Sequence, residues 1–329
     1  MDTFTGKLAV VTGGGTGMGR ELTRQLAAEG CHVAICDVSD TNMADTLAAC
    51  EHEAPPGTRL SSFVADVSKE ADFIAFRDHV LATHDTDHID LLFNNAGIGG
   101  GGSVLNDPRE EWEQVFNVCW GGVYHGVRTF LPLLVKSDEG RIVNTSSVNG
   151  FWASIGPENS HTAYCAAKFA VKGFSEALIT DLRLTAPNVG VSVVMPGHIG
   201  TSIVFNSGSY LGRDPKELHA EQVADVRDRI AARGIDVAGA SDEDLRNLMV
   251  AMAEGFRDNA PTTAAQAATI ILDGVRNGDW RILVGEDAHI LDEAVRADPT
   301  QAYEPAFLER LRAQGVFTNM PQSQGPSGQ

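Results

Sequence analysis

A glycine-rich turn that directly follows an apolar run near the N-terminus constrains the fold of this chain more than any other feature. Residues 7–12 (KLAVVT) are apolar and β-branched, which is typical of a buried parallel strand. The turn runs from Gly13 to Gly19, and residues 20–29 then have helical character. This order predicts a dinucleotide site, because glycines let the backbone approach a pyrophosphate and a helix N-terminus attracts it. The alternative is a flexible surface turn, which needs no flanking apolar strand.

A carboxylate at the end of the second apolar run bears on the choice of cofactor. Residues 31–37 (CHVAICD) read as a strand that ends in Asp37. An acid at this point can accept both ribose hydroxyls of an adenosine, and it repels a 2′-phosphate. Val38 follows it, and Thr16 in the turn is uncharged, so no basic side chain is ready for a phosphate. These residues favour NAD over NADP, although Asp37 taken alone could be a solvated strand end.

The alternation of strand and helix continues along the chain. Four βα units in succession predict a doubly wound α/β fold of Rossmann type, with helices on both faces of a parallel sheet of about seven strands. Ligands of such sheets bind at the carboxyl ends of the strands. The further strands are expected at 60–64, 89–93, 142–144, 189–195 and 280–284, and the further helices at 41–52, 71–84, 109–134 and 264–277.

Tyr164 and Lys168 are the strongest candidates for chemistry. Four residues apart on an expected helix, they lie on one face, one turn apart. A tyrosine phenol has a pKa of about 10, and bringing it near 7 requires roughly 4 kcal/mol of preference for the phenolate. One ammonium about 4 Å away supplies this only at an effective dielectric constant near 20, as in a partly buried cleft. Ser147, at a strand end, could hydrogen-bond the same oxygen. The pair alone could also be an ordinary surface pair.

Composition narrows the classes of function. The chain has 44 acidic and 25 basic residues and a net charge of −19, so nucleic acid and anionic membranes are not expected partners. No apolar run reaches the roughly 18 residues of a spanning helix, and no signal peptide is recognisable, so we expect a cytoplasmic protein. The five cysteines lack metal-ligand spacing, which predicts no metal site and no disulfide framework. Cys165 is expected to be a small core residue of its helix rather than a nucleophile.

Taken together, these motifs resemble those of the short-chain dehydrogenase/reductase family, in its NAD-preferring form with an enlarged lid and a C-terminal extension. They occur in the family's order over much of the chain. The interval from Ser147 to Tyr164 is longer than the commonest pattern, which makes the substrate harder to infer. The matching motifs are Thr12–Gly19, Asp66-Val67, Asn94-Asn95-Ala96-Gly97, Asn117, Ser147, Tyr164-x-x-x-Lys168 and Pro196-Gly197.

The resemblance implies roles for individual residues. Tyr164 is the general acid or base, and Lys168 lowers its pKa and holds the ribose. Ser147, rather than Ser146, orients the substrate oxygen, and Asn117 anchors a water for proton relay. Asp66 contacts the adenine. The cofactor-binding residues are Gly13, Gly15, Thr16, Gly17, Met18, Gly19, Asp37, Val38, Asp66, Val67, Asn95, Ala96, Gly97, Tyr164, Lys168, Pro196, Gly197, Ile199 and Thr201.

The implied activity is hydride transfer between NAD(H) and a hydrophobic secondary alcohol or ketone, such as a cyclic, terpenoid, aromatic or steroid one. His161 is interpreted as a loop histidine rather than a base. A non-catalytic NAD-sensing protein on the same fold is the alternative, and an epimerase or dehydratase is a third reading. The residues expected to contact substrate are Ile98, Ser147, Phe151, Trp152, His198 and Phe205.

The chain is expected to divide into a catalytic domain with two additions. Residues 1–285 form the Rossmann-type domain, and residues 203–261 within it form a helical lid over the substrate. Residues 286–320 form a helical extension, and residues 321–329 have a disordered composition. The resemblance also implies a homodimer or homotetramer, built through the helix at 109–134 and the helix that carries Tyr164.

Overall fold

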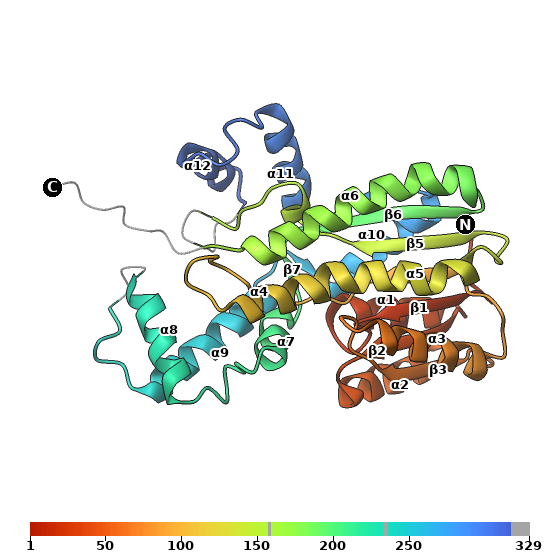
Figure 1. Cartoon of the computed structure of the whole chain (residues 1–329), viewed down its shortest axis with the longest axis horizontal. Helices are drawn as coiled ribbons and strands as arrows, with labels where there is room; N and C mark the ends of the chain where they lie inside the picture. The colour runs from red at the N-terminus through yellow and green to blue at the C-terminus, as the bar shows by residue number, and fades with distance from the viewer. Residues whose placement is uncertain (157–158, 233–235, 317–329) are drawn as a thin grey trace.

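A parallel seven-stranded sheet forms the centre of the protein, as expected from the sequence (Figure 1). The computed structural model describes residues 1–156, 159–232 and 236–316, so the tail expected at 321–329 lies outside the described residues. The strand order is β3-β2-β1-β4-β5-β6-β9. The strands are β1 (Leu8–Thr12), β2 (His32–Asp37), β3 (Leu60–Val64), β4 (Leu91–Asn94), β5 (Gly140–Thr145), β6 (Val189–Pro196) and β9 (Arg281–Val284).

Side chains alternate between two hydrophobic cores on the two faces of the sheet. In β1, Leu8 and Val10 belong to one core, and Ala9 and Val11 belong to the other. Burial on both faces explains why these strands read as continuous apolar runs in the sequence. The first core is covered by α3 (Glu70–His84), α5 (Gly122–Leu134) and α6 (Thr162–Thr185), and the second by α1 (Gly17–Ala28), α2 (Asp40–Glu53) and α10 (Ala264–Asn277).

The strand order reverses between β1 and β4, which lie side by side although β2 and β3 separate them in the sequence. Val11 of β1 pairs with Phe93 of β4, and Thr12 pairs with Cys36 of β2. This register brings the glycine turn and the segment after Asn94 to the same edge of the sheet. A crevice at such a reversal is where ligands of open α/β sheets bind.

The long helix expected at 109–134 is interrupted. The chain forms α4 (Arg109–Phe116), then a π-helical stretch from Asn117 to Gly121, and then α5. Single π-helical turns inside α-helices are frequent at functional sites. The irregular stretch therefore indicates that this part of the helix borders a functional site.

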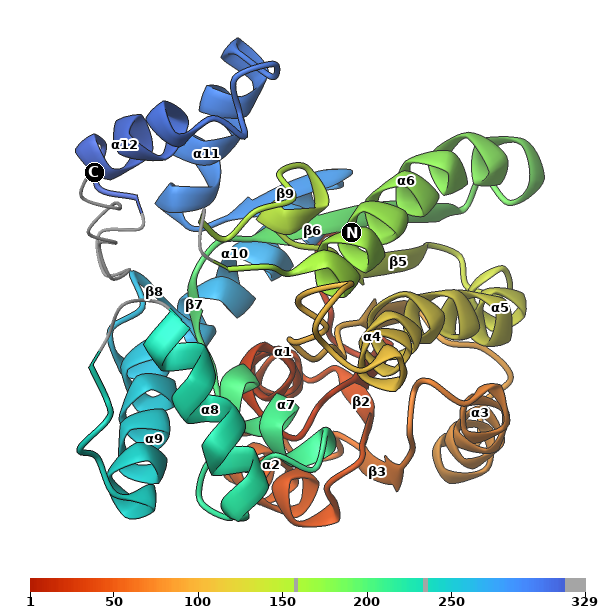
Figure 2. The ribbon, with the colours of Figure 1, turned by 60° about the vertical axis from the view of Figure 1, so that its left-hand side comes forward.

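The inserted segment forms three helices beyond the carboxyl ends of the strands (Figures 1 and 2). They are α7 (Ile203–Tyr210), α8 (Ala220–Ala232) and α9 (Asp242–Asp258). Val223 and Leu245 belong to a small core formed by the α8–α9 region itself. A short parallel pair, β7 (Ile199–Gly200) with β8 (Thr262–Thr263), joins the two ends of the insertion and was not predicted.

In the described residues 286–316 the C-terminal part forms two helices, and residues 317–320 of the expected extension lie outside the described residues. The two helices are α11 (Glu286–Ala297) and α12 (Pro305–Ala313), with a turn between them. Both pack around a third core that includes Leu291, Phe307 and Leu311. In Figure 2 these helices lie apart from the lid helices, on the side of β9.

Candidate active site

The glycine turn is closely packed and presents the amino end of α1. A Cβ atom at Gly19 would lie 2.0 Å from the carbonyl oxygen of Gly13, and one at Gly13 would lie 2.9 Å from Cα of Ala96. Gly13 and Gly17 have φ values of 66° and 54°, which favour glycine. The amides of residues 16–19 donate to no described residue. These donors and the positive end of the helix dipole fit the pyrophosphate of a dinucleotide.

Two carboxylates lie at the end of the cleft where an adenosine would fit. Asp37 ends β2 and accepts a 3.0 Å hydrogen bond from the amide of Gly15 in the turn. Asp66 accepts two hydrogen bonds from Ser68, one from its amide and one from its hydroxyl. Burial alone would raise the pKa of Asp66, but the hydrogen bonds from Ser68 and the nearby Lys69 lower it on balance. Both side chains are therefore held as acceptors. Val38, after Asp37, is exposed.

Asparagine side chains fix the edge of the sheet between the turn and the catalytic residues. The Nδ2 atom of Asn94 donates to Oδ1 of Asn144 over 2.9 Å, inside the sheet. Asn95 donates from its side chain to the carbonyl oxygen of Thr12, and the Thr12 hydroxyl accepts from the amides of Asn95 and Ala96. These contacts hold Asn95 and Ala96 against the turn, where the sequence predicted them.

Ser147, Tyr164 and Lys168 come together at the carboxyl end of β5. Tyr164 lies in the first turn of α6, and its hydroxyl forms a hydrogen bond with Ser147. The Nζ atom of Lys168 is 5.3 Å from the centroid of the Tyr164 ring and donates to the carbonyl oxygen of Thr145 over 2.9 Å. A Cβ atom at Gly97 would lie 3.4 Å from the same Nζ atom, so Gly97 faces this group. The three side chains converge as predicted.

The structure also shows that Ser146 and Ser147 have different hydrogen-bond partners. The Ser146 hydroxyl donates to the carbonyl oxygen of Lys168 and is almost fully buried, which is a role in fixing α6 to β5. Ser147 instead directs its hydroxyl oxygen to the amide of Asn149 and to Tyr164. Ser147 is thus the serine in a position to meet a reacting oxygen.

Burial opposes ionisation of both catalytic groups. Burial raises the pKa of the Tyr164 phenol, and the hydrogen bond with Ser147 lowers it in part. Burial likewise lowers the pKa of the Lys168 ammonium. Two groups held together in this way stabilise each other's charged form when the phenol ionises, because the surrounding dielectric constant is low.

The role of Asn117 in anchoring a water stays a prediction. Its side chain is exposed at the start of the π-helical stretch, and it donates to no described residue. Cys119, two residues further on, is fully buried, and its Sγ atom donates to the carbonyl oxygen of Ile98 over 3.2 Å. A Cβ atom at Gly97 would lie 3.7 Å from this sulfur, so Cys119 borders the space beside Lys168. The irregular helix turns the sulfur inward, which residue spacing alone could not reveal.

The loop after β6 is held by a residue of the C-terminal extension. The amide of His198 donates to Oδ2 of Asp287 over 2.6 Å, and a Cβ atom at Gly197 would lie 2.3 Å from this carboxylate. Asp287 is in the first turn of α11, and the sequence analysis did not include it. Burial raises the pKa of Asp287, and the His198 amide lowers it in part. A side chain at position 197 would displace this carboxylate. The loop expected to carry the nicotinamide is therefore attached to α11.

The remaining residues of that loop lie largely as predicted. Pro196 ends β6, and Ile199 is buried in β7. The methyl group of Thr201 faces the turn, because a Cβ atom at Gly17 would lie 3.1 Å from it. Val67 is buried against Gly122, and Met18 packs on the core under α1.

Helix α7 contacts both the glycine turn and the loop after β4. Asn206 donates to the hydroxyl of Thr16 over 2.7 Å, and the Tyr210 hydroxyl lies 3.2 Å from Oδ2 of Asp66. On its other side, Ser207 accepts a 2.8 Å hydrogen bond from the amide of Gly99. The helix thus contacts the turn, the expected adenine site and the loop next to Tyr164.

Several residues expected to contact substrate have other partners. Trp152 is buried in the C-terminal core, where its Nε1 atom donates to the carbonyl oxygen of Ala302. Phe151, which is only partly buried, packs on the same core, and the prediction that these two residues contact substrate stays a prediction. Residues 151–153 meet the C-terminal extension, which lies far away in the sequence. Phe205 of α7 is half-buried, with the Lys216 ammonium 5.7 Å from its ring centroid.

Two further residues expected to contact substrate, His198 and Ile98, lie in different surroundings. The His198 ring stacks on Phe256 with a centroid distance of 4.3 Å, and its Nε2 atom lies 2.8 Å from the Phe256 carbonyl oxygen. Its side chain is thus fixed to α9 rather than available to substrate. Ile98 is buried beside the catalytic group through its contact with Cys119.

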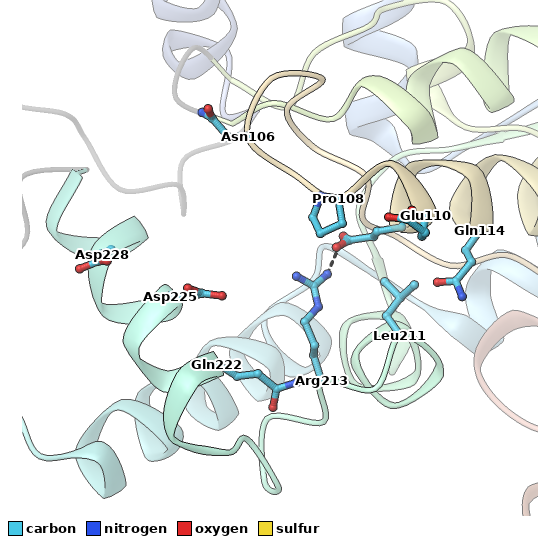
Figure 3. A pocket seen from close by; sticks show the side chains of 10 residues that line it. Asn106, Pro108, Glu110, Gln114, Leu211, Arg213, Gln222, Asp225 and Asp228 are labelled. Atoms are coloured by element: carbon cyan, nitrogen blue, oxygen red, sulfur yellow. Dashed lines mark hydrogen bonds and ion pairs between the residues drawn. The ribbon is translucent and has the colours of Figure 1, made fainter.

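A cavity of about 570 Å³ lies between α8 and the start of α4 (Figure 3). Arg213 forms an ion pair with Glu111 on one side, and Asp225 and Asp228 of α8 line the other. The lining does not include Tyr164 or Ser147. This cavity is therefore a feature of the lid and not the catalytic centre.

Other classes of site find no support in the described part of the chain. There, no cluster of three or more potential metal ligands occurs. All five cysteines are buried and unpaired, including Cys165. Among the same residues, no helix combines the length and apolar character that a bilayer-spanning segment needs.

Comparison with known proteins agrees with this geometry. The family model described as short chain dehydrogenase matches residues 7–210. The chain is 32% identical over 321 residues to SadH of Mycobacterium tuberculosis, covering 98% of this chain and 99% of SadH. It is 33% identical over 229 residues to levodione reductase of Leifsonia aquatica, covering 68% of this chain and 80% of that protein.

A solved structure is similar to this chain over its whole length. A short-chain dehydrogenase/reductase from Burkholderia phymatum, in complex with NAD, superposes with a TM-score of 0.67 at 26% identity and covers 100% of both chains. The fold is that of a Rossmann-type oxidoreductase. This chain belongs to the short-chain dehydrogenase/reductase family.

Proposed function

We propose that this protein catalyses the NAD-dependent oxidation of a hydrophobic secondary alcohol to a ketone, or the reverse reduction. The observation that carries the proposal is the convergence of Ser147, Tyr164 and Lys168 at the sheet edge that also presents the glycine turn. A nicotinamide bound along this edge supplies the hydride exchange. The protein supplies the proton transfer and the placement of the reacting oxygen.

Tyr164 is the proposed general base in oxidation and general acid in reduction. Its phenol is buried, so it needs a stabilising positive charge before it can ionise near neutral pH. Lys168 is the buried cation beside it, with Nζ 5.3 Å from the ring centroid. At an effective dielectric constant of about 20, such a charge contributes a few kcal/mol, which is the size of shift that the phenol requires. Ser147 would orient the substrate oxygen toward the phenol.

NAD is the proposed cofactor rather than NADP. Asp37 lies at the end of β2 beside the turn, where its carboxylate would meet the ribose hydroxyls of NAD and repel a 2′-phosphate. We expect Asp37→Ser to narrow the preference for NAD over NADP, measured as the ratio of kcat/KM values, by at least about tenfold. Asp40→Ser, on the exposed start of α2, is the control and should leave the ratio unchanged. An unchanged ratio in Asp37→Ser would contradict this choice of cofactor.

A hydrophobic substrate is supported by the apolar residues around the catalytic group. Ile98 lies beside it, and Val204 and Phe205 are on α7, with Val204 37% exposed. Relatives of the chain include levodione reductase of Leifsonia aquatica and D-beta-hydroxybutyrate dehydrogenase of Cupriavidus necator. We therefore propose a cyclic or branched alcohol or ketone of modest size, with apolar groups that α7 would cover.

The experiment that tests this function is a panel assay. The full-length protein would be mixed with NAD and secondary alcohols, and with NADH and ketones, while the absorbance of the reduced cofactor is followed. Turnover of at least one compound, lost in Tyr164→Phe, is the expected result. Cofactor binding without any turnover across the panel would instead favour an NAD-sensing protein.

We also propose a homo-oligomer formed through α5 and α6. Tyr124 of α5 and Phe169 of α6 are 40% and 41% exposed, and Trp120 and Phe174 pack edge to face close by. Aromatic residues on neighbouring helices are typical of an interface. Light scattering of the wild type and of Phe169→Asp tests the proposal. A monomeric wild type would refute it.

A further inference from the structure

His161 is a polar side chain beside Tyr164 that the proposed chemistry does not use. It immediately precedes α6, and its ring centroid is 4.6 Å from that of Tyr164, with 34° between the ring planes. The imidazole is half-buried. The sequence indicated only a loop histidine, because nothing in the residue spacing shows that the chain folds the ring back onto the catalytic tyrosine.

Two further elements border the space that His161 faces. A Cβ atom at Gly99 would lie 4.0 Å from Cε1 of His161 and 3.8 Å from the hydroxyl of Ser207. The loop after β4, helix α7 and His161 thus meet around Gly99, next to the Tyr164 ring. Gly99 carries no side chain, so none of its own atoms separates His161 from Ser207.

The imidazole has no structural task that would explain its polarity. Its side chain does not cap α6, although it occupies the N-cap position. Within the described residues, neither ring nitrogen has a hydrogen-bond partner. A half-buried imidazole beside Tyr164 is therefore free to donate a hydrogen bond to a bound ligand, or to accept one from it.

The protonation state restricts what this ligand can be. Burial lowers the pKa of His161 to about 4, so the ring is neutral at neutral pH. A neutral imidazole offers one N–H donor and one acceptor nitrogen. It therefore suits a hydroxyl or carbonyl oxygen better than a carboxylate or phosphate, which would need a cation.

We propose that His161 is a specificity-determining residue that hydrogen-bonds a second oxygen of the substrate, one or two carbons away from the carbon that reacts. The inference rests on the proposed function, because it takes Tyr164 as the group that contacts the reacting oxygen. The two rings are neighbours, with centroids 4.6 Å apart, so one small substrate can meet both. The substrate class is thus a hydroxyketone, a diketone or the corresponding diol, with an apolar remainder.

The test compares ketones that differ only in the second oxygen. The full-length protein would reduce cyclohexanone, 2-hydroxycyclohexanone and 3-hydroxycyclohexanone with NADH, and kcat/KM would be measured for each. We expect the wild type to prefer one of the oxygenated ketones by about tenfold or more, as is usual for one hydrogen bond in a buried site. His161→Phe keeps an aromatic ring against Tyr164 but removes both nitrogens, so the preference should disappear.

Two matched variants keep the test specific. His161→Asn retains a donor and an acceptor and should restore part of the preference. His52→Phe removes an exposed histidine of α2 and should leave the preference as in the wild type. NADH affinity, measured by fluorescence, shows that each variant is folded.

The remaining outcomes would overturn either the role of His161 alone or the proposed function as well. A wild type that reduces cyclohexanone as well as both oxygenated ketones would overturn the role of His161 but leave the proposed function intact. A His161→Phe variant that keeps the preference would do the same. A wild type that binds NADH but neither reduces any ketone nor oxidises any alcohol would overturn the proposed function. This inference would then fail with it.

Discussion

The cofactor side and the substrate side of the cleft are built in different ways. On the cofactor side, backbone packs against backbone, as where Gly19 meets the carbonyl oxygen of Gly13. On the substrate side, helices with small cores of their own reach the site through single contacts, such as those of Ser207 and Asp287. The cofactor side therefore tolerates almost no added atom, whereas the substrate side can change without disturbing the sheet. Specificity can vary on such a protein while its cofactor site stays fixed.

The largest expected effect lies at the junction of the two sides. Tyr164→Phe removes the only group proposed to exchange the proton, so kcat should fall by about a thousandfold or more, as is typical for a positioned acid–base group. NAD affinity, measured by fluorescence titration, should change by less than about twofold because the turn is untouched. A variant with substantial residual kcat would show that another group carries the proton.

The second largest effect is expected when one methyl group is added to the glycine turn on the cofactor side. Gly19→Ala places a carbon where the Gly13 carbonyl lies, so we expect it to lower the free energy of unfolding by about 1–3 kcal/mol. NAD affinity should fall with it. Gly239→Ala in the lid is the control, because a Cβ atom there has no heavy atom within 4 Å. Denaturant unfolding of both variants measures the difference, and equal losses would contradict the contrast drawn above.

A smaller effect is expected where the C-terminal extension reaches the loop after β6. Asp287→Asn weakens a charge-assisted hydrogen bond to the His198 amide, so affinity for NAD should fall by about tenfold. Affinity for ADP-ribose, which lacks the nicotinamide, should stay within about twofold. This split distinguishes positioning of the nicotinamide from general damage to the cleft. Glu286→Gln, on the exposed neighbour, is the control, and parallel losses for both ligands would refute the role of Asp287.

The smallest effect is expected at the position that the family resemblance made important. Asn117→Ala should change kcat by less than about twofold, because the side chain is exposed. Cys119→Ala should lower kcat more, because its sulfur lies beside the space that Lys168 occupies. Steady-state kinetics of the two variants decides between them. A larger loss in Asn117→Ala would restore the original assignment.

The sequence was most informative where local pattern determines structure. The glycine turn, the seven strands and the spacing of Tyr164 and Lys168 could be predicted because each depends on neighbouring residues. Contacts between distant segments could not be predicted in the same way. Trp152 was expected to contact substrate, but its contacts with Ala302 and Phe307, which lie far away in the sequence, could not be predicted.

The same limit explains what was missed at the site. Asp287 reaches His198 only because α11 returns to the carboxyl edge of the sheet. Cys119 faces inward only because the helix is π-helical at that point, a change of phase that heptad or 3.6-residue patterns do not record. His161 stacks on Tyr164 through the path of a loop whose sequence has no periodicity.

Helix α7 has a kinetic consequence. Asn206 and Tyr210 attach it to Thr16 and Asp66, while Ser207 attaches it to Gly99 on the other flank. One swing of this short segment would then open both the cofactor side and the substrate side of the site. We expect this swing, rather than proton transfer, to limit the rate of each turnover.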